Sequence, residues 1–204
     1  MQPQKPAVER IPLTEVTFAF VDTETTGLAP QNGGRVCEVA VVLTRGDKQV
    51  ETFSQLINPA MPIPPHISAI HGITDDMVRD QPIFAQVAPR LLSLLSGAAV
   101  VCHNADFDVS FLSWEFQQAG LRFPPSVILD TLRLARKHGG FKSNRLGNIV
   151  AELGISSEGW HRALSDAMMT EKVFRHFVDK FSSEGELTLA DLVEYQTKAL
   201  RRKQ

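Results

Sequence analysis

The sequence predicts an α/β fold, a mixed β-sheet with helices on its faces. Two observations support this class. The first is the order of the predicted elements, in which three extended strands are followed by short strands that alternate with helices. The second is the spacing of apolar residues, which changes from short β-branched runs to the intervals of one helix face. At 204 residues, the chain is long enough for one domain, with or without a tail.

Each predicted element corresponds to a local pattern. Runs of apolar and β-branched residues predict strands at Val16 to Val21, Arg35 to Leu43, Gln49 to Ile57, Ala98 to Cys102 and Val127 to Leu129. Helical spacing predicts helices at Pro82 to Leu95, Phe107 to Ala119, Leu132 to Lys137, Arg145 to Leu153 and Arg162 to Phe181. A proline-rich loop after the third strand leads into the segment IHGIT. In open α/β sheets, sites form where strands end, so functional residues are expected there.

Composition narrows the classes of function. The formal net charge of −2 gives no overall attraction to nucleic acid, so a polyanion would need a local basic patch or a metal. Cys37 and Cys102 lie in apolar runs, so we expect buried free thiols. No apolar run approaches the roughly 20 residues that span a bilayer, and no signal peptide is recognised in the polar lead of residues 1–13. We therefore expect a cytoplasmic protein without membrane contact.

The most informative segment is FAFVDTETTGL, where an apolar strand ends at Asp22 and Glu24. Side chains two positions apart on a strand point to the same face, so both carboxylates are aimed at one place. Burying paired negative charge is costly without a cation, and Mg²⁺ or Mn²⁺ prefers carboxylate oxygen. The alternative is an ordinary turn, because Asp, Thr and Gly are common where strands end. We predict a metal site.

Two later segments carry further acidic residues at strand and helix ends. Asp108 follows an apolar strand in VVCHNADFDVSFL, at the start of a predicted helix. In WHRALSDAMMT, His161 precedes a helix and Asp166 lies in its first turns. Taken alone, each Asp has a structural explanation, because an acidic residue near a helix N-terminus complements the helix dipole.

Together, the motifs Asp-x-Glu, His-Asn-Ala-x-Phe-Asp and His-x-Ala-x-x-Asp-Ala resemble the DEDDh, or DnaQ-like, family of 3′→5′ exonucleases. This family includes the epsilon subunit of bacterial DNA polymerase III, whose exonuclease domain the chain resembles, ribonuclease T and oligoribonuclease. IHGIT and LDTLRLAR agree in order and spacing. A sister branch has Tyr in place of His161, whereas the one tyrosine here, Tyr195, lies outside the motif. The resemblance implies a ribonuclease-H-like domain over residues 14–182.

The resemblance also implies the roles of the acidic residues and the histidine. Two Mg²⁺ or Mn²⁺ ions would be held by the four matching acids, with Asp22 bridging, Glu24 and Asp166 on the side of the attacking water, and Asp108 supporting the second ion. His161 would be the general base. It must be neutral to accept a proton, so we expect activity to rise with pH through the neutral range.

Substrate contacts follow from the same resemblance. Backbone groups around Thr25, Thr26 and Gly27 would hold the terminal nucleotide, and Leu28 would pack near its base. His71, Asn104 and Phe107 are further substrate-binding candidates. For Phe107 a core position is the alternative, because an aromatic residue beside an apolar strand is more often part of the core.

Two segments remain open. A basic stretch contains Arg133, Arg136, Lys137, Lys142 and Arg145, and it is either a solvated surface or a contact for the nucleic-acid backbone. Residues 183–204 predict an amphipathic helix or tail with the apolar residues Leu189, Leu192, Val193 and Leu200. This helix either packs on its own domain or binds a polymerase partner.

The sequence therefore predicts a 3′→5′ exonuclease that releases nucleoside monophosphates from single-stranded or frayed DNA by two-metal hydrolysis. The first alternative is an exonuclease for RNA or short oligonucleotides, because sugar choice rests on 2′-hydroxyl contacts that one sequence does not expose. The second is a polymerase-associated proofreading or binding subunit. A catalytically inactive scaffold is disfavoured, because all five catalytic positions match the family motif.

Overall fold

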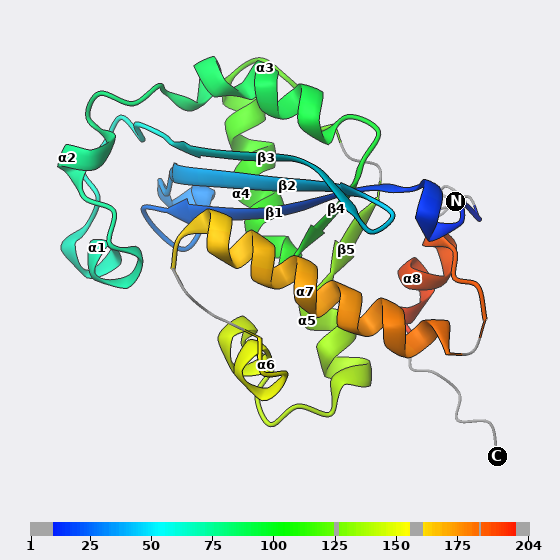
Figure 1. Ribbon diagram of the computed structural model, residues 1–204. Coiled ribbons are helices and arrows are strands. Elements are labelled where there is room, and N and C mark those ends of the chain that lie inside the picture. The colour runs from blue at the N-terminus through cyan, green and yellow to red at the C-terminus, as the bar shows by residue number, and fades with distance from the viewer. Residues whose placement is uncertain (1–9, 125–126, 156–160, 184, 199–204) are drawn as a thin grey trace, which may run out of the picture.

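A five-stranded mixed sheet forms the centre of the molecule (Figure 1). The computed structural model describes residues 10–124, 127–155, 161–183 and 185–198. The strands lie in the order β3-β2-β1-β4-β5. Their bounds are β1 (Thr17–Thr25), β2 (Val36–Arg45), β3 (Lys48–Leu56), β4 (Ala99–Cys102) and β5 (Ile128–Asp130). β1, β2 and β3 pair antiparallel, and β4 and β5 run parallel to β1. The predicted mixed sheet is confirmed.

The side chains of β1 point alternately to the two faces of the sheet, and each face has its own apolar cluster. Phe18 and Phe20 face α7 (Ala163–Ser182) in one apolar cluster, whereas Ala19 and Val21 lie in a second cluster. The second cluster is formed with α3 (Phe84–Leu95) and α4 (Ala105–Gln118). Because side chains alternate along a strand, Asp22 and Glu24 continue the α7 face and Thr23 continues the other. Figure 1 shows α7 crossing the front of the sheet with α4 behind it.

The remaining helices surround this core. They are α1 (Pro65–His71), α2 (Asp75–Val78), α5 (Thr131–Leu134), the π-helical turn η3 (Ala135–Gly139), α6 (Leu146–Glu152) and α8 (Leu189–Tyr195), with the 3₁₀ turns η1 (Leu13–Glu15) and η2 (Pro30–Asn32). The proline-rich loop is present as expected up to Pro64, and α1 begins at Pro65, because a proline in the first helical turn has a missing N–H that costs nothing. The sequence predicted no helix here. The helix predicted at Leu132 to Lys137 is divided between α5 and η3. The first strand extends to Thr25, because its polar end still pairs with β2.

The two ends of the domain pair with each other. Leu13 N–H donates to the Leu187 carbonyl over 3.3 Å, and Leu189 N–H donates to the Ile11 carbonyl over 2.9 Å. Leu189 and Leu192 of α8 are buried in the core beneath α7. The Gln196 side chain accepts from Asp130 N–H and donates to the Ile128 carbonyl, which extends the pairing of β5. Residues 187–196 thus pack on the rest of the domain, while Leu200 lies outside the described residues.

Smaller features complete the fold. Both cysteines are free and buried, as predicted. Cys37 lies in a third apolar cluster with Ile63, Ile73 and Val78, which seats α1 and α2 beyond the end of β1. Within the described ranges, every helix is too short or too polar to cross a bilayer.

Candidate active site

The C-terminal end of β1 presents carboxylates on the face covered by α7. Asp22 pairs with Ala40 of β2 and Glu24 pairs with Glu38, and the register shifts immediately after Glu24. Opposite residues on antiparallel strands point to the same side, so Glu38 shares the face of the two predicted acids. The sequence therefore places Asp22 and Glu24 together, and the β2 register adds a third carboxylate.

Asp166 completes an acidic cluster with β1. One carboxylate oxygen from each of Asp22, Glu24 and Asp166 lies within 4.8 Å of the others. Asp166 lies in the first turn of α7, whose N-terminal end meets the C-terminal end of β1 (Figure 1). Its Oδ1 atom is buried without a hydrogen-bond partner. Among the described residues, no lysine or arginine forms an ion pair with these three acids.

Asp108 lies beside the cluster but is held differently. It is buried in the first turn of α4, on the opposite face of β1. Its Oδ1 atom accepts from Thr23 N–H over 3.0 Å and from the Thr23 hydroxyl over 2.8 Å. Thr23, between the two acids of β1, thus fixes the fourth predicted acid, although Asp108 is not in the group of three.

In the absence of a cation, all four acids have pKa values above their ordinary range. Burial raises the pKa of Asp22 well above its ordinary value, and the charges of Asp108 and Asp166 raise it further. Burial, with the charges of Asp166 and Glu38, raises the pKa of Glu24 to about 8. Burial raises the pKa of Asp108 to about 7 against the Thr23 hydrogen bonds, and that of Asp166 to about 6. A cation bound here would displace protons and relieve this repulsion.

Glu38 is a functional candidate that the sequence reasoning missed. It is only 1% exposed, and its carboxylate accepts from Arg162 Nε over 3.2 and 3.1 Å and from Nη2 over 2.7 Å. It also accepts from Ala163 N–H, the first residue of α7, over 3.0 Å. The available signal was one charged residue within the apolar run RVCEVAVVL. Glu38 therefore ties the start of α7 to the sheet beside the acidic cluster.

His161 lies just before the residues at the start of α7 that Glu38 binds. It directly precedes Arg162, the N-cap of α7, and its backbone is left-handed with φ of 64°. A backbone hydrogen bond from His161 to Asp166 lowers the pKa of that carboxyl, against its burial. The side chain of His161 is exposed. The left-handed residue turns the chain immediately before α7, and the backbone bond to Asp166 places the His161 backbone beside the acidic cluster.

The predicted terminal-nucleotide segment differs in exposure from residue to residue. Thr25 and Thr26 are buried: the Thr25 hydroxyl donates to the Gly27 carbonyl, and the Thr26 hydroxyl accepts from Arg35 N–H. Leu28 is 84% exposed, the largest value among the exposed large hydrophobic residues. The threonines thus shape a rigid turn, and Leu28 projects from it into solvent, where a base could pack.

The other three predicted contacts occupy different environments. His71 is buried, its Nδ1 accepts from Ile73 N–H over 3.0 Å, and burial lowers its pKa. Asn104 is exposed and left-handed with φ of 74°. Phe107 is half-buried, with its ring 5.0 Å from that of Phe111 at the edge of the core. Asn104 is therefore the most accessible of the three, and His71 mainly supports the turn around Ile73.

The donor set fits divalent metal ions. Carboxylate oxygens from one strand and one helix converge, one of them is buried without a hydrogen-bond partner, and no lysine or arginine in the described ranges forms an ion pair with them. Hard cations such as Mg²⁺ and Mn²⁺ prefer this kind of oxygen cluster. The fold and the site together define an α/β protein whose acidic residues at the end of the central strand could hold a metal ion.

Comparison with known proteins identifies the family. The family model described as Exonuclease (RNase_T) matches residues 19–174, which include all five predicted catalytic residues. The chain belongs to this exonuclease family, in its DEDDh, DnaQ-like class. Its relatives are named as an exonuclease and as a DNA polymerase III component, and an activity for this chain is therefore a proposal.

Individual relatives agree with this assignment. The chain is 35% identical over 176 residues to the 3′-5′ exonuclease DinG of Bacillus subtilis, covering 86% of this chain and 19% of that protein. It is 35% identical over 183 residues to a DNA polymerase III subunit epsilon-like protein of Rhodobacter capsulatus, covering 88% and 26%. The chain thus spans about a fifth and a quarter of these relatives.

A solved structure shows the same fold over its whole length. Exonuclease X in complex with 5′ overhanging duplex DNA superposes with a TM-score of 0.66 at 27% identity, covering 89% of this chain and 99% of that one. The ribonuclease-H-like mixed sheet predicted from the sequence is therefore confirmed.

Proposed function

We propose that this protein removes nucleoside monophosphates one at a time from the 3′ ends of single-stranded or frayed DNA. The observation that carries this proposal is the acidic cluster of Asp22, Glu24 and Asp166, which gathers buried negative charge where a polyanion would have to bind. Such a cluster repels a phosphodiester unless cations reverse its sign. Exonuclease X, the structural neighbour, is a DNA-bound enzyme, which supports DNA as the substrate.

The acids of the cluster would hold two Mg²⁺ or Mn²⁺ ions, with Asp108 supporting from the α4 side. When bound, the ions supply positive charge that activates water and stabilises the negative charge that develops on the phosphate oxygens. Thr23 keeps Asp108 oriented through its two hydrogen bonds. The Glu38–Arg162 pair holds the first turn of α7, and therefore Asp166, against the end of β1.

His161 is proposed to take the proton from the attacking water at its imidazole nitrogen. Its exposure lets it reach substrate and then pass the proton to solvent. Because the imidazole acts only when neutral, we expect activity to rise with pH through the neutral range. A flat profile with chemistry rate-limiting would exclude His161 as the base.

The proposed substrate groove begins at the Thr25–Leu28 turn. The exposed Leu28 would pack against the terminal base, and backbone groups of the turn would hold the sugar and phosphate. Contact with the 2′ position decides between DNA and RNA, so an exonuclease for RNA or short oligonucleotides is the alternative outcome of the test.

The test is a time course on a 5′-labelled single-stranded DNA with Mg²⁺, beside an RNA of the same sequence. The control is Asp22→Ala. A ladder that shortens from the 3′ end and is absent with the control supports the proposal, and the faster strand identifies the preferred sugar. If neither strand is shortened in Mg²⁺ or Mn²⁺, the exonuclease proposal is wrong.

The second candidate function is that of a polymerase-associated subunit, because one relative is a DNA polymerase III subunit epsilon-like protein. The C-terminal helix gives it limited support, because Leu189 and Leu192 of α8 are already buried against the domain. A partner would have to meet the outer face of α8. Deleting residues 197–204, which leaves α8 intact, and measuring polymerase capture tests whether the tail contributes.

A further inference from the structure

The basic stretch between residues 133 and 145 divides into two groups. Arg133 is already ion-paired. Its guanidinium donates to both oxygens of Asp106 over 2.9 Å and lies 3.4 Å from Asp130. Arg136 and Arg145 are exposed, and neither forms an ion pair with any described carboxylate. Two guanidinium groups are therefore available to bind an anion.

These two arginines border the same hollow. It has a volume of about 530 Å³ and lies between β4, η3 and α6, with Asn104 and Asn144 also on its wall. Arg136 lies in the π-helical turn η3, a rare conformation that often occurs at functional sites. The hollow thus combines two free cations with the exposed Asn104 that the family resemblance indicates near substrate.

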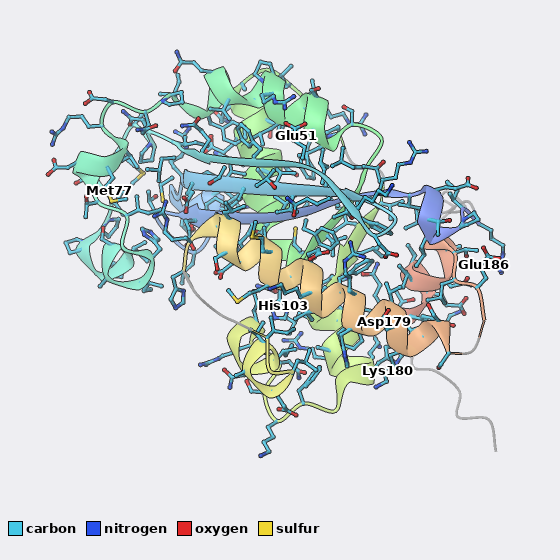
Figure 2. All side chains as sticks on the ribbon, viewed as in Figure 1. Glu51, Met77, His103, Asp179, Lys180 and Glu186 are labelled. Carbon is cyan, nitrogen blue, oxygen red and sulfur yellow. The ribbon has the colours of Figure 1, made fainter. Side chains whose placement is uncertain are left out.

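His103 shapes the hollow without adding charge. Its Nε2 lies 2.9 Å from the Asn144 carbonyl and its Nδ1 lies 2.8 Å from the Thr131 hydroxyl. A carbonyl only accepts, so Nε2 carries the hydrogen, and burial lowers the pKa of this ring. In the neutral ring, Nδ1 accepts the single Thr131 hydroxyl hydrogen over 2.8 Å, in place of the longer 3.3 Å bond from that hydroxyl to the Cys102 carbonyl. Figure 2 shows His103 between α7 and α6. The positive charge of the hollow therefore comes from the arginines.

The hollow lies one to two strands from the acidic cluster along the same edge of the sheet. β4 runs parallel to β1 with Phe20 opposite Val101, so the residues after Cys102 lie beside the acids of β1. β5 follows, with Asp130 opposite Cys102. Adjacent strands are roughly 4.8 Å apart, so the hollow is on the order of 5 to 10 Å from the cluster. That is the reach of the next nucleotides of a bound strand.

We propose that this hollow is an upstream phosphate site, in which Arg136 and Arg145 bind a backbone phosphodiester on the 5′ side of the cleaved bond. This proposal rests on the proposed function. Two guanidinium groups suit a phosphate, because each presents planar N–H donors to its oxygens. Asn104 adds an amide on the side of the hollow nearest the acids. The site would set substrate length rather than base sequence, because it contacts only the backbone.

The experiment compares two substrates in the intact chain with Mg²⁺. One is an oligothymidylate of about 12 nucleotides, and the other is thymidine 5′-p-nitrophenyl phosphate, which has no upstream phosphate. The variant Arg136→Gln/Arg145→Gln should lower kcat/KM on the oligonucleotide about tenfold or more, mainly through KM. On the nitrophenyl ester it should stay within about twofold of the unaltered protein.

Salt dependence gives a second readout. Loss of the one neutralised phosphate should reduce the slope of log KM against log salt by about 0.7, the value per phosphate on single strands. The matched control is Arg45→Gln/Lys48→Gln, which removes the same charge at the turn between β2 and β3, away from this edge. The control should keep the slope of the unaltered protein.

Each outcome separates the two proposals. Equal losses on both substrates, or the same change in the control, would overturn the phosphate site while leaving the nuclease intact. No hydrolysis of either substrate by the unaltered protein would instead overturn the proposed function. A 5′-phosphorylated and a 5′-hydroxyl dinucleotide distinguish the phosphates: loss confined to the phosphorylated dinucleotide, with the oligonucleotide unaffected, would contradict an internal backbone site.

Discussion

Buried carboxylates are neutralised in one region of this molecule and left without a basic partner in another. Glu115, 2% exposed, accepts from Arg35 Nε and Nη2 over 2.7 and 2.8 Å, and Glu38 is bound by Arg162 in the same forked manner. Asp22, Glu24 and Asp166 have no such arginine among the described residues. Guanidinium groups thus pair with the two structural glutamates, whereas the described acids of the cluster form no arginine ion pair, which is consistent with the proposed metal site.

The largest effect is expected for Asp22→Asn, which removes one charge from the cluster and keeps the side-chain size. This variant tests whether the cluster differs from the arginine-paired acids. Exonuclease turnover in Mg²⁺ should fall by at least about 10²-fold, the scale of losing one electrostatic contact with the transition state. In EDTA the same variant should melt at a higher temperature than the unaltered protein, because like-charge repulsion is relieved. Activity assays and thermal denaturation measure the two effects, and a lower melting temperature in EDTA would contradict the unneutralised cluster.

A second prediction concerns the paired glutamate next to the site. Glu38→Gln should lower kcat about 10- to 100-fold, the range for residues that orient metal ligands, with a smaller change in KM. The reason is that Glu38 holds Arg162 and the first turn of α7, and through them His161 and Asp166. A pH–rate profile that shifts in the variant supports positioning of His161. Glu38→Asp, which restores the charge, should recover part of the loss, and an unaltered kcat in Glu38→Gln would refute the role.

Glu115→Gln provides the contrasting case, because Glu115 pairs with Arg35 and has no proposed part in catalysis. The substitution leaves Arg35 without its partner, and it should lower the free energy of unfolding by about 2 to 4 kcal/mol, given that Arg35 keeps some contact with water. Activity per folded molecule should be retained. Urea denaturation and active-site titration measure these quantities, and a loss of activity without a loss of stability would remove the distinction between the two regions.

A further prediction concerns pH. The Glu24 pKa is raised from 4.5 to about 8, and those of Asp108 and Asp166 are raised to about 7 and about 6, so the folded protein binds protons more tightly than the unfolded chain. Stability of the metal-free protein should therefore fall as pH rises from about 5 to about 8.5. Melting curves in EDTA measure this decline.

Mg²⁺ or Mn²⁺ should reverse the pH effect. The metals bind deprotonated carboxylates, so the rise in melting temperature on adding metal should be larger near pH 8.5 than near pH 6. Equal metal-induced shifts at both pH values would show that the raised carboxyl pKa values do not govern binding.

Local patterns predicted the central parts of both fold and site. The β-branched runs placed the strands, and Asp22 and Glu24 share a face because strand alternation requires it. Asp166 was found through the family motif His-x-Ala-x-x-Asp-Ala, which begins before the helix and continues into its first turn. Helix α1 was missed, because its seven residues are too few to show a clear apolar period and its packing beside Cys37 is not visible in a local pattern.

The sequence by itself determined the mixed sheet, the exonuclease family and the five catalytic candidates, because strand alternation and motif order are local properties of the chain. Only the tertiary structure decided which charges are neutralised. Arg162 meets Glu38 across 124 positions and Arg35 meets Glu115 across 80, pairings that no local pattern encodes. The separation of Arg133 from Arg136 and Arg145 was likewise decided by which carboxylates the fold brings near, since ion pairs depend on distance in space.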